Sequence, residues 1–186
     1  MDRVEQILDG LNVPFKGIRV YRGQDLLKSH SFQALTALLL REEGFQNVEI
    51  NLDVPYQKHK QGPSTTRDVD VSGLLTAPST LRLVECKAEL RNKPLDPAYV
   101  RKFYKETVPA ALKFFRKKSV PFRVCQAEIW TTGLLNEIAK NELIGISLNR
   151  AVEPVLRDYN DLSELVPTNL SSCKKLLAAL AAVGIT

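Results

Sequence analysis

Two short segments of the chain combine charged side chains with alternating apolar residues. The first carries Asp68 and Asp70, and the second carries Glu85 and Lys87. In a β-strand, residues two positions apart point to the same face. If both segments are strands, Asp68 shares a face with Asp70, and Glu85 lies beside Lys87 at the end of its strand.

Asp70 and Glu85 offer the ligand type of a site for a hard divalent cation. If their strands are antiparallel neighbours, as the short turn between them indicates, the two carboxylates come within reach of one ion. Magnesium favours a few carboxylate or carbonyl oxygens, with water and substrate phosphate completing its octahedron. Such a site needs no cluster of His or Cys.

A site of this kind could hydrolyse a phosphodiester. The reaction needs an activated water, neutralisation of the charge that develops on the phosphorus oxygens, and help for the leaving alkoxide; a bound cation can supply all three. Lys87 would add positive charge near the phosphate and could orient or deprotonate the water, although a base needs a lowered pKa. Adjacent carboxylates raise the pKa of a lysine, and a bound metal lowers it.

A helix and a strand precede these segments. Apolar residues dominate residues 32–43, Ser29 or Ser31 could cap a helix there, and Gly44 is a suitable stop. The next segment has the period of two that is typical of a half-buried strand, and its apolar residues are Val48, Ile50, Leu52 and Val54. We therefore expect a helix and then a strand with these four residues on one face.

The remaining elements are predicted from periodicity and turn residues. Strands are expected at residues 68–75, 81–87, 122–131 and 144–148, with a turn at 77–79. Helices are expected at 98–118, with an interruption at Pro109, at 134–141, and from Ser171 or Ser172 to residue 180. The order through residue 131 is αβββαβ.

Asp70, a hairpin-like gap and then Val84-Glu85-Cys86-Lys87 together resemble the PD-(D/E)XK, or restriction-endonuclease-like, nuclease superfamily. The resemblance implies that Asp70 and Glu85 bind the metal and that the backbone carbonyl of Cys86 is a further ligand. It also implies that Lys87 is the catalytic lysine. Asp68 would occupy the less constant position just before the key aspartate.

The resemblance extends over about residues 32–148. The helix that opens with Phe32-Gln33 looks like the first helix of the family, and the segment Ile129-Trp130-Thr131-Thr132-Gly133 is similar to the end of Mrr-type restriction enzymes. Archaeal Holliday-junction resolvases have a similar layout. Membership implies an α/β fold with a restriction-endonuclease-like αβββαβ core, in which helices flank a mixed central sheet.

One position departs from the family pattern. The first helix of this class often carries a glutamate after the aromatic residue, and here that position is Gln33. Gln33 could still hold a metal-bound water, or Glu42 or Glu43 could replace the missing acid if the alignment shifts by a turn. The departure leaves open whether one metal or two would bind.

Basic residues outside the trio could contact a phosphate backbone. The candidates are Lys58, Lys60, Arg67, Arg101, Lys102 and Lys105. Further basic residues follow at helical spacing up to Lys118, and a run of this kind is as often a solvated helix face. The aromatic residues of the same region, Tyr99 among them, are expected to pack the opposite, buried side.

Length and composition fit one domain over residues 1–186, with a core at about 29–150 and helical additions at both ends. The net charge of +5 favours a polyanionic partner weakly. Three widely spaced cysteines indicate neither a disulfide framework nor a zinc site, and no segment has the layout of an export signal or a membrane span. We expect a cytoplasmic protein, nucleoid-associated if prokaryotic.

The expected activity is that of a Mg²⁺-dependent endodeoxyribonuclease, with Mn²⁺ as a substitute and DNA as the partner. A homodimer would supply one active site for each strand of a duplex or junction. Two alternatives stay open: a nucleic-acid-binding module of the same fold with little or no catalysis, and an RNA nuclease. Sequence specificity, junction preference and pathway cannot be derived from one chain.

Overall fold

The computed structural model describes residues 24–58, 62–89, 93–158 and 160–161, and for residues 24–31 it describes the backbone alone. Among these residues, no helix is both long and apolar enough to cross a membrane. The closing helix predicted from Ser171 or Ser172, and the predicted N-terminal addition, lie outside the described residues.

Helix α2 spans Gln24–Glu42, so it begins earlier than predicted. Ser29 and Ser31 lie inside the helix and do not cap it, because the helix continues through them into a more polar segment. The predicted stop is confirmed. Gly44 has a φ of +89° and its N–H donates to the carbonyl of Arg41 at 2.9 Å, a left-handed helix end that suits glycine.

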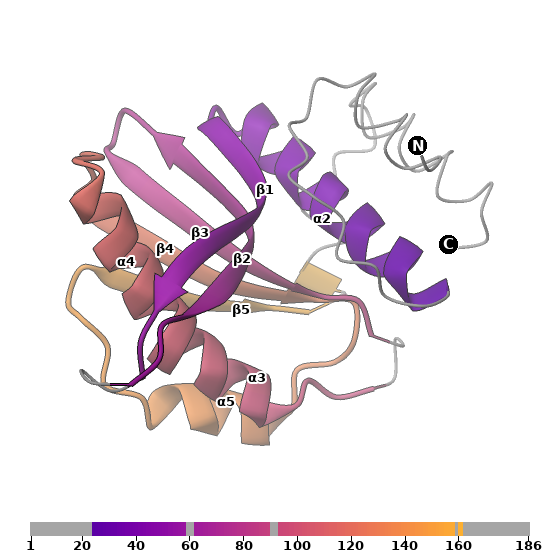
Figure 1. The fold of residues 1–186 in the computed structure, drawn as a ribbon. Coiled ribbons are helices and arrows are strands. Elements are labelled where there is room, and N and C mark those ends of the chain that lie inside the picture. Colours follow the sequence, from indigo (N-terminus) through magenta and orange to yellow (C-terminus); the bar gives the residue numbers. More distant parts are fainter. Residues whose placement is uncertain (1–23, 59–61, 90–92, 159, 162–186) are drawn as a thin grey trace.

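Five strands form one mixed sheet in sequential order. They are β1 (Gln46–Tyr56), β2 (Thr65–Leu75), β3 (Thr80–Lys87), β4 (Val124–Thr131) and β5 (Val152–Arg157). Strands β1, β2 and β3 are antiparallel neighbours, whereas β4 runs parallel to β3, and β5 runs parallel to β4. The protein therefore has a mixed α/β fold with helices on both sides of the sheet (Figure 1).

The prediction that the four apolar residues of β1 share one face is wrong. All four are buried, but Val48 and Ile50 pack in the core under α2, whereas Leu52 and Val54 pack in the core on the other side of the sheet. Asn51, between the two pairs, has a φ of +55°, a left-handed conformation that asparagine tolerates and that breaks the alternation. The β1–β2 ribbon thus crosses from one core to the other.

A segment of three consecutive helical parts covers the second core. It consists of α3 (Pro97–Lys102), a π-helical turn η1 (Phe103–Thr107) and α4 (Val108–Lys117). The predicted interruption at Pro109 lies slightly too late, since the irregular turn precedes α4. Pro109 occupies the first turn of α4, where the absence of its N–H leaves no helical bond unmade.

The strand predicted at residues 144–148 is also wrong. Helix α5 spans Glu137–Ile144, and the N–H of Ile146 then donates to the carbonyl of Leu143 at 3.0 Å. The alternating apolar residues therefore close a turn instead of joining the sheet. The sheet gains β5 further on, where Val152 lies opposite Cys125, so the core extends past the predicted limit at residue 150.

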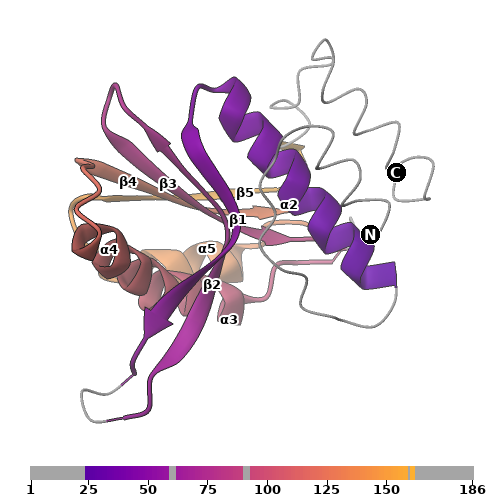
Figure 2. The ribbon, with the colours of Figure 1, turned by 45° about the horizontal axis from the view of Figure 1, so that its top comes forward.

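Two helical layers enclose the sheet, with α2 on one face and the α3–η1–α4 segment on the other (Figure 2). Along β3, Leu81 and Leu83 contribute to the core under α3 and α4, whereas Val84 and Cys86 contribute to the core under α2. This alternation places Glu85 and Lys87 on the same face as the two leucines, as predicted.

Candidate active site

The candidate site lies where β2 parts from β3. Paired residues run from Leu75 opposite Thr80 to Val71 opposite Val84. Asp70 is the next residue of β2 beyond this last pair, and its Oδ2 accepts a 2.7 Å hydrogen bond from the backbone N–H of Cys86. A side-chain carboxylate therefore binds an N–H of β3 at the point where strand pairing ends.

The backbone of Cys86 faces the same gap. In an extended strand, the N–H and C=O of one residue point toward the same neighbouring strand. Because the N–H of Cys86 points to Asp70, its carbonyl oxygen is directed to that side as well. The thiol of Cys86 points elsewhere: its sulfur lies 3.4 Å from the Thr36 hydroxyl oxygen inside the core, and Cys86 is buried.

Gln33 reaches Asp70 from helix α2. Its Nε2 donates a 2.9 Å hydrogen bond to Oδ1 of Asp70, and the glutamine is 4% exposed. Each oxygen of the Asp70 carboxylate thus accepts an N–H from a different element. The structure brings the predicted Gln33 into the site as a hydrogen-bond donor, a role that a glutamate could not fill when ionised.

Glu85 and Lys87 form an ion pair at the carboxyl end of β3. The distance from Lys87 Nζ to Glu85 Oε1 is 2.5 Å, and the two side chains are 21% and 17% exposed. The pair is therefore half-buried but still open to solvent. The structure brings Asp70, Glu85 and Lys87 together, as the sequence predicted.

The pKa of Asp70 is raised from 3.8 to about 7. Burial is the main cause, and the negative charge of Glu85 raises the pKa further, while Lys87 and the two N–H donors act in the opposite direction. Two carboxylates thus share a site in which one ammonium group does not balance their charge. This is an electrostatic environment that a divalent cation would relieve.

Lys87 has a pKa above its ordinary value. Burial acts to lower the pKa, but the Glu85 and Asp70 carboxylates raise it by more. The ammonium form is therefore the stable one in this site. Of the two roles predicted for Lys87, the raised pKa favours, in the site without a bound cation, a positive charge that orients a water or phosphate.

Tyr99 is a site residue that the sequence interpretation missed. It was expected to pack in the core, yet it is 38% exposed, and its ring centroid lies 4.7 Å from Lys87 Nζ. The expectation does hold for Phe103 and Tyr104, each 1% exposed. Tyr99 lies in the first turn of α3, and no sequence pattern indicated that it would contact Lys87.

Asp68 lies two residues before Asp70 on the part of β2 that pairs with β1. Its partner across the ladder is Asp53. The charges that shift the pKa of Asp70 come from Glu85 and Lys87. A supporting role for Asp68 therefore stays a prediction.

Several other acids have structural partners. Glu43 forms an ion pair with Arg82 at the opposite end of β3, so it does not replace the missing family acid. Glu128 is 1% exposed and binds Arg82, Arg157 and the indole N–H of Trp130. These contacts indicate a structural role for Glu128.

The candidate nucleic-acid-binding residues divide into two groups. Arg67 pairs with Glu106 at 2.5 Å, and Arg101 pairs with Glu142 at 2.7 Å, so both cations are already partly neutralised. Lys58, Lys102 and Lys105 are exposed. Lys60 lies outside the described residues.

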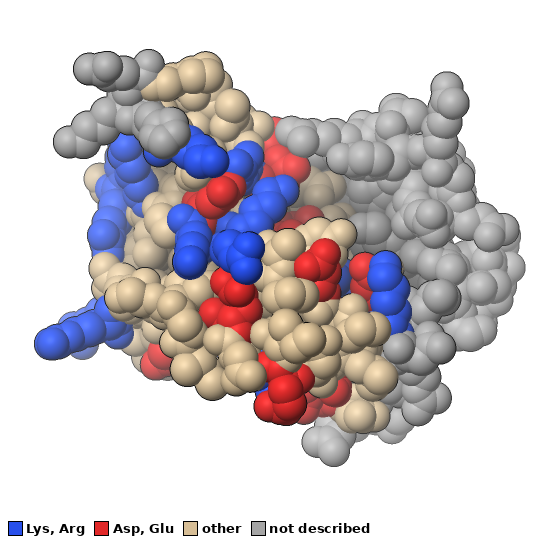
Figure 3. All heavy atoms as spheres, turned by 90° about the horizontal axis from the view of Figure 1, so that it is seen from below, with Lys and Arg blue, Asp and Glu red and all other residues tan. Residues whose placement is uncertain are grey.

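Basic and acidic side chains lie side by side on the face drawn in Figure 3. The exposed basic residues of the α3–η1–α4 segment continue beyond the predicted set with Lys113, Arg116, Lys117 and Lys118. A phosphate backbone on this side would meet positive charge interrupted by carboxylates.

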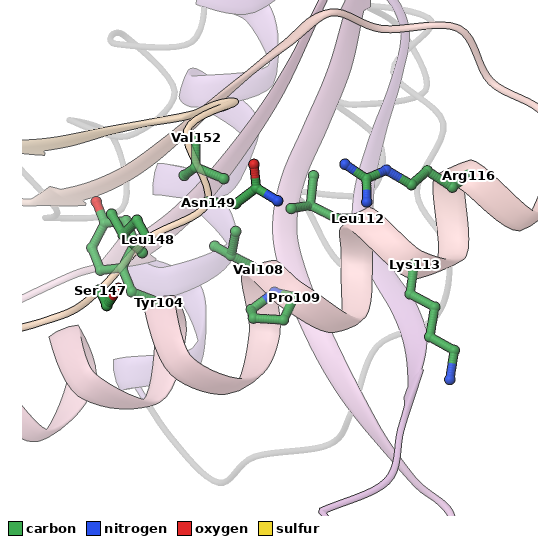
Figure 4. Close-up of a pocket in the computed structure, with 10 residues that line it drawn as sticks. All are labelled: Tyr104, Val108, Pro109, Leu112, Lys113, Arg116, Ser147, Leu148, Asn149 and Val152. Atoms are coloured by element: carbon green, nitrogen blue, oxygen red, sulfur yellow. The ribbon is translucent and has the colours of Figure 1, made fainter.

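A cavity of about 310 Å³ lies between α4 and the segment that leads to β5 (Figure 4). Its lining is mostly apolar, with Val108, Leu112 and Val152 among the contributors, and Lys113 and Arg116 add positive charge. No carboxylate lines it. Because the cavity adjoins the start of β5, whereas Glu85 and Lys87 lie at the far end of β3, the two features are distinct.

The oxygen donors that the site offers to a cation come from two carboxylates and the main chain. Within the described part of the chain, no three side chains of His, Cys, Asp or Glu come together as a ligand set. Asp70, Glu85 and the Cys86 carbonyl provide hard oxygen donors of the type that Mg²⁺ accepts when water and substrate supply the rest. This donor chemistry and the uncompensated negative charge both fit a single hard cation.

Comparisons with known proteins name no family. No protein-family model matches the chain, and no curated protein matches it. One similar solved structure is a protein of unknown function called AF1548, with 20% sequence identity, a TM-score of 0.48, and coverage of 86% of this chain and 79% of that chain. Another is protein VC1899 from Vibrio cholerae, with 14% identity, a TM-score of 0.44, and coverage of 95% and 42%. Neither likeness carries a functional argument.

Proposed function

We propose that this chain is a metal-dependent endonuclease of the PD-(D/E)XK type that hydrolyses DNA phosphodiester bonds. The observation that carries the proposal is the convergence of Asp70, Glu85 and Lys87 where β2 parts from β3. Direct attack by an activated water would complete the reaction, with no covalent intermediate on the protein.

The order of elements supports a restriction-endonuclease-like core. Helix α2, the three antiparallel strands, the helical crossover and the parallel strand β4 follow the αβββαβ order that the resemblance implies. The acid pair lies on the neighbouring antiparallel strands β2 and β3, and the helix that opens the core supplies Gln33. Both positions support the resemblance, with glutamine in place of the glutamate that the family often carries.

Asp70, Glu85 and the Cys86 carbonyl would hold a Mg²⁺ ion, for which Mn²⁺ would substitute. When bound, the ion would lower the pKa of a ligating water and neutralise charge on the phosphate. The protein prepares this site by fixing Asp70 before any ion arrives, because Gln33 and the Cys86 N–H hold one carboxylate oxygen each. Preorganised ligands of this kind reduce the cost of binding.

Lys87 contributes a fixed positive charge. Its raised pKa keeps the ammonium protonated, so it can donate hydrogen bonds to a non-bridging phosphate oxygen or to the attacking water. The ion pair with Glu85 holds the ammonium at the acid pair without closing it off from solvent.

A cleavage assay tests the proposal. Labelled linear duplex, single-stranded and branched DNA, and RNA, are incubated with Mg²⁺, Mn²⁺ or EDTA. The wild type is compared with Asp70→Asn, Glu85→Gln and Lys87→Ala, and Glu153→Gln on β5 is a matched control because Glu153 is exposed. We expect cation-dependent cutting of DNA that the three site variants reduce by at least about a hundredfold and the control leaves unchanged.

The other outcomes separate the alternatives. Binding without cleavage of any substrate would favour the nucleic-acid-binding module, and preferential cleavage of RNA would favour the RNA nuclease. Cutting that survives Lys87→Ala, or that proceeds in EDTA, would show that the active site lies elsewhere.

A further inference from the structure

Tyr99 lies against Lys87 although the two residues belong to different elements. The ring centroid is 4.7 Å from the ammonium nitrogen, within the range of a cation–π interaction. Tyr99 is 38% exposed, while the next aromatic residues of the same segment, Phe103 and Tyr104, are each 1% exposed. Core packing explains the positions of those two residues and does not explain that of Tyr99.

The start of α3 is fixed by contacts independent of Lys87. The Asp96 side chain caps the helix by accepting the N–H of Ala98 at 2.8 Å. Leu95 is 1% exposed, and its N–H donates to the carbonyl of Leu134 at 2.9 Å. Because the backbone on the N-terminal side is anchored in this way, the ring of Tyr99 is presented to the lysine from a firm support.

A lysine held by an ion pair alone is poorly positioned. Its side chain has four rotatable bonds, and a single carboxylate partner at the edge of the solvent does not fix all of them. A second carboxylate would hold the ammonium more tightly but would repel a phosphate. An aromatic face attracts the cation without adding net negative charge, and an ammonium with three N–H bonds can still donate to a third group.

We propose that Tyr99 is a positioning residue for Lys87, which together with Glu85 holds the ammonium group in place for the phosphate. The inference rests on the proposed nuclease function and adds to it a residue that the trio does not include. The ring is the active element, and the phenolic hydroxyl is not required.

Single-turnover cleavage tests the inference with a double-mutant cycle. Tyr99→Leu removes the ring and keeps apolar bulk, and we expect it to slow cleavage by about five- to thirtyfold with little change in DNA affinity. Tyr99→Phe keeps the ring and should restore most of the rate. In a Lys87→Ala background, Tyr99→Leu should cause no further loss, because the interaction is already absent.

Equal losses from Tyr99→Leu in the two backgrounds would overturn the inference, as would a Phe variant as slow as the Leu variant. A second measurement needs neither metal nor DNA. The side-chain methylene protons of Lys87 should show an upfield ring-current shift in nuclear magnetic resonance spectra, lost in Tyr99→Leu and kept in Tyr99→Phe. If the wild type shows this shift but cuts nothing, the nuclease proposal fails while the contact stands; absence of the shift overturns the inference directly.

Discussion

Asp70 should make the metal-free protein less stable as the pH rises, and Asp70→Asn should remove that loss. The pKa of Asp70 is 3.8 in a model peptide and about 7 in the folded protein. Between these values the folded protein keeps a proton that the unfolded chain has released. Stability is therefore fully present below about pH 4 and declines as the pH rises toward 7.

The magnitude follows from the same two values. A difference of about three pKa units corresponds to about 4 kcal/mol, and relaxation around the charged pair reduces what is measured to about 2–4 kcal/mol. Asparagine has the shape and charge of a protonated aspartate. We therefore expect Asp70→Asn to match the wild type at pH 4 and to be more stable by about 2–4 kcal/mol at pH 8.

Urea unfolding at pH 4, 6 and 8 in EDTA measures this difference. Glu153→Gln is the control, since Glu153 is exposed on β5, and a surface substitution of this kind changes stability by no more than about 0.5 kcal/mol. Adding Mg²⁺ at pH 8 should stabilise the wild type and leave Asp70→Asn unchanged. A wild-type stability that stays constant between pH 5 and 7.5 would refute the electrostatic account of the site.

Three further experiments test other parts of the structure. Gln33→Glu adds a third carboxylate beside Asp70, so calorimetric titration should show tighter Mn²⁺ binding than in the wild type; equal or weaker binding would contradict the placement of Gln33 at the metal site. Glu128→Gln leaves the cations of Arg82 and Arg157 with a weaker buried partner and should cost about 2–4 kcal/mol in urea unfolding, whereas the exposed Glu153→Gln should cost almost nothing. The double substitution Lys102→Ala with Lys105→Ala should weaken DNA binding and lower the slope of log affinity against log salt by about one for each lysine that contacts phosphate. Arg101→Ala should have a smaller effect, because Arg101 already pairs with Glu142. Fluorescence anisotropy at several salt concentrations measures both effects.

The trio could be predicted from the sequence because its geometry is local to two short strands. On β3, a period of two is enough to place Glu85 beside Lys87, and the strand keeps that alternation throughout. The turn after β2 is short enough to force an antiparallel neighbour, which brings Asp70 to the same place. The position of the trio therefore depends on few contacts between residues that are distant in the sequence.

Other features depended on contacts between distant residues. At Asn51, the apolar side chains of β1 switch from the core under α2 to the core on the other side of the sheet. The spacing of apolar residues in the sequence does not reveal this switch. The residues before β5 alternate as a strand would, yet Gly145 ends α5 there and the following Ile146 closes a turn. A pattern of hydrophobic residues indicates which residues are buried. In these two places, it does not indicate which layer of the fold or which element a buried residue belongs to.

The parting of β2 from β3 explains why the acid pair can exist in a well-packed protein. Continued pairing would have directed the Cys86 N–H to a backbone carbonyl, and the gap would have closed. Because the Asp70 carboxylate takes this N–H, the polar groups of β3 remain satisfied while a negatively charged side chain stays inside the fold. Gln33 and Lys87 reduce the electrostatic cost without removing it, as the raised pKa of Asp70 shows. The remaining charge would give the site affinity for a cation, so the same feature that lowers stability near neutral pH supports the proposed chemistry.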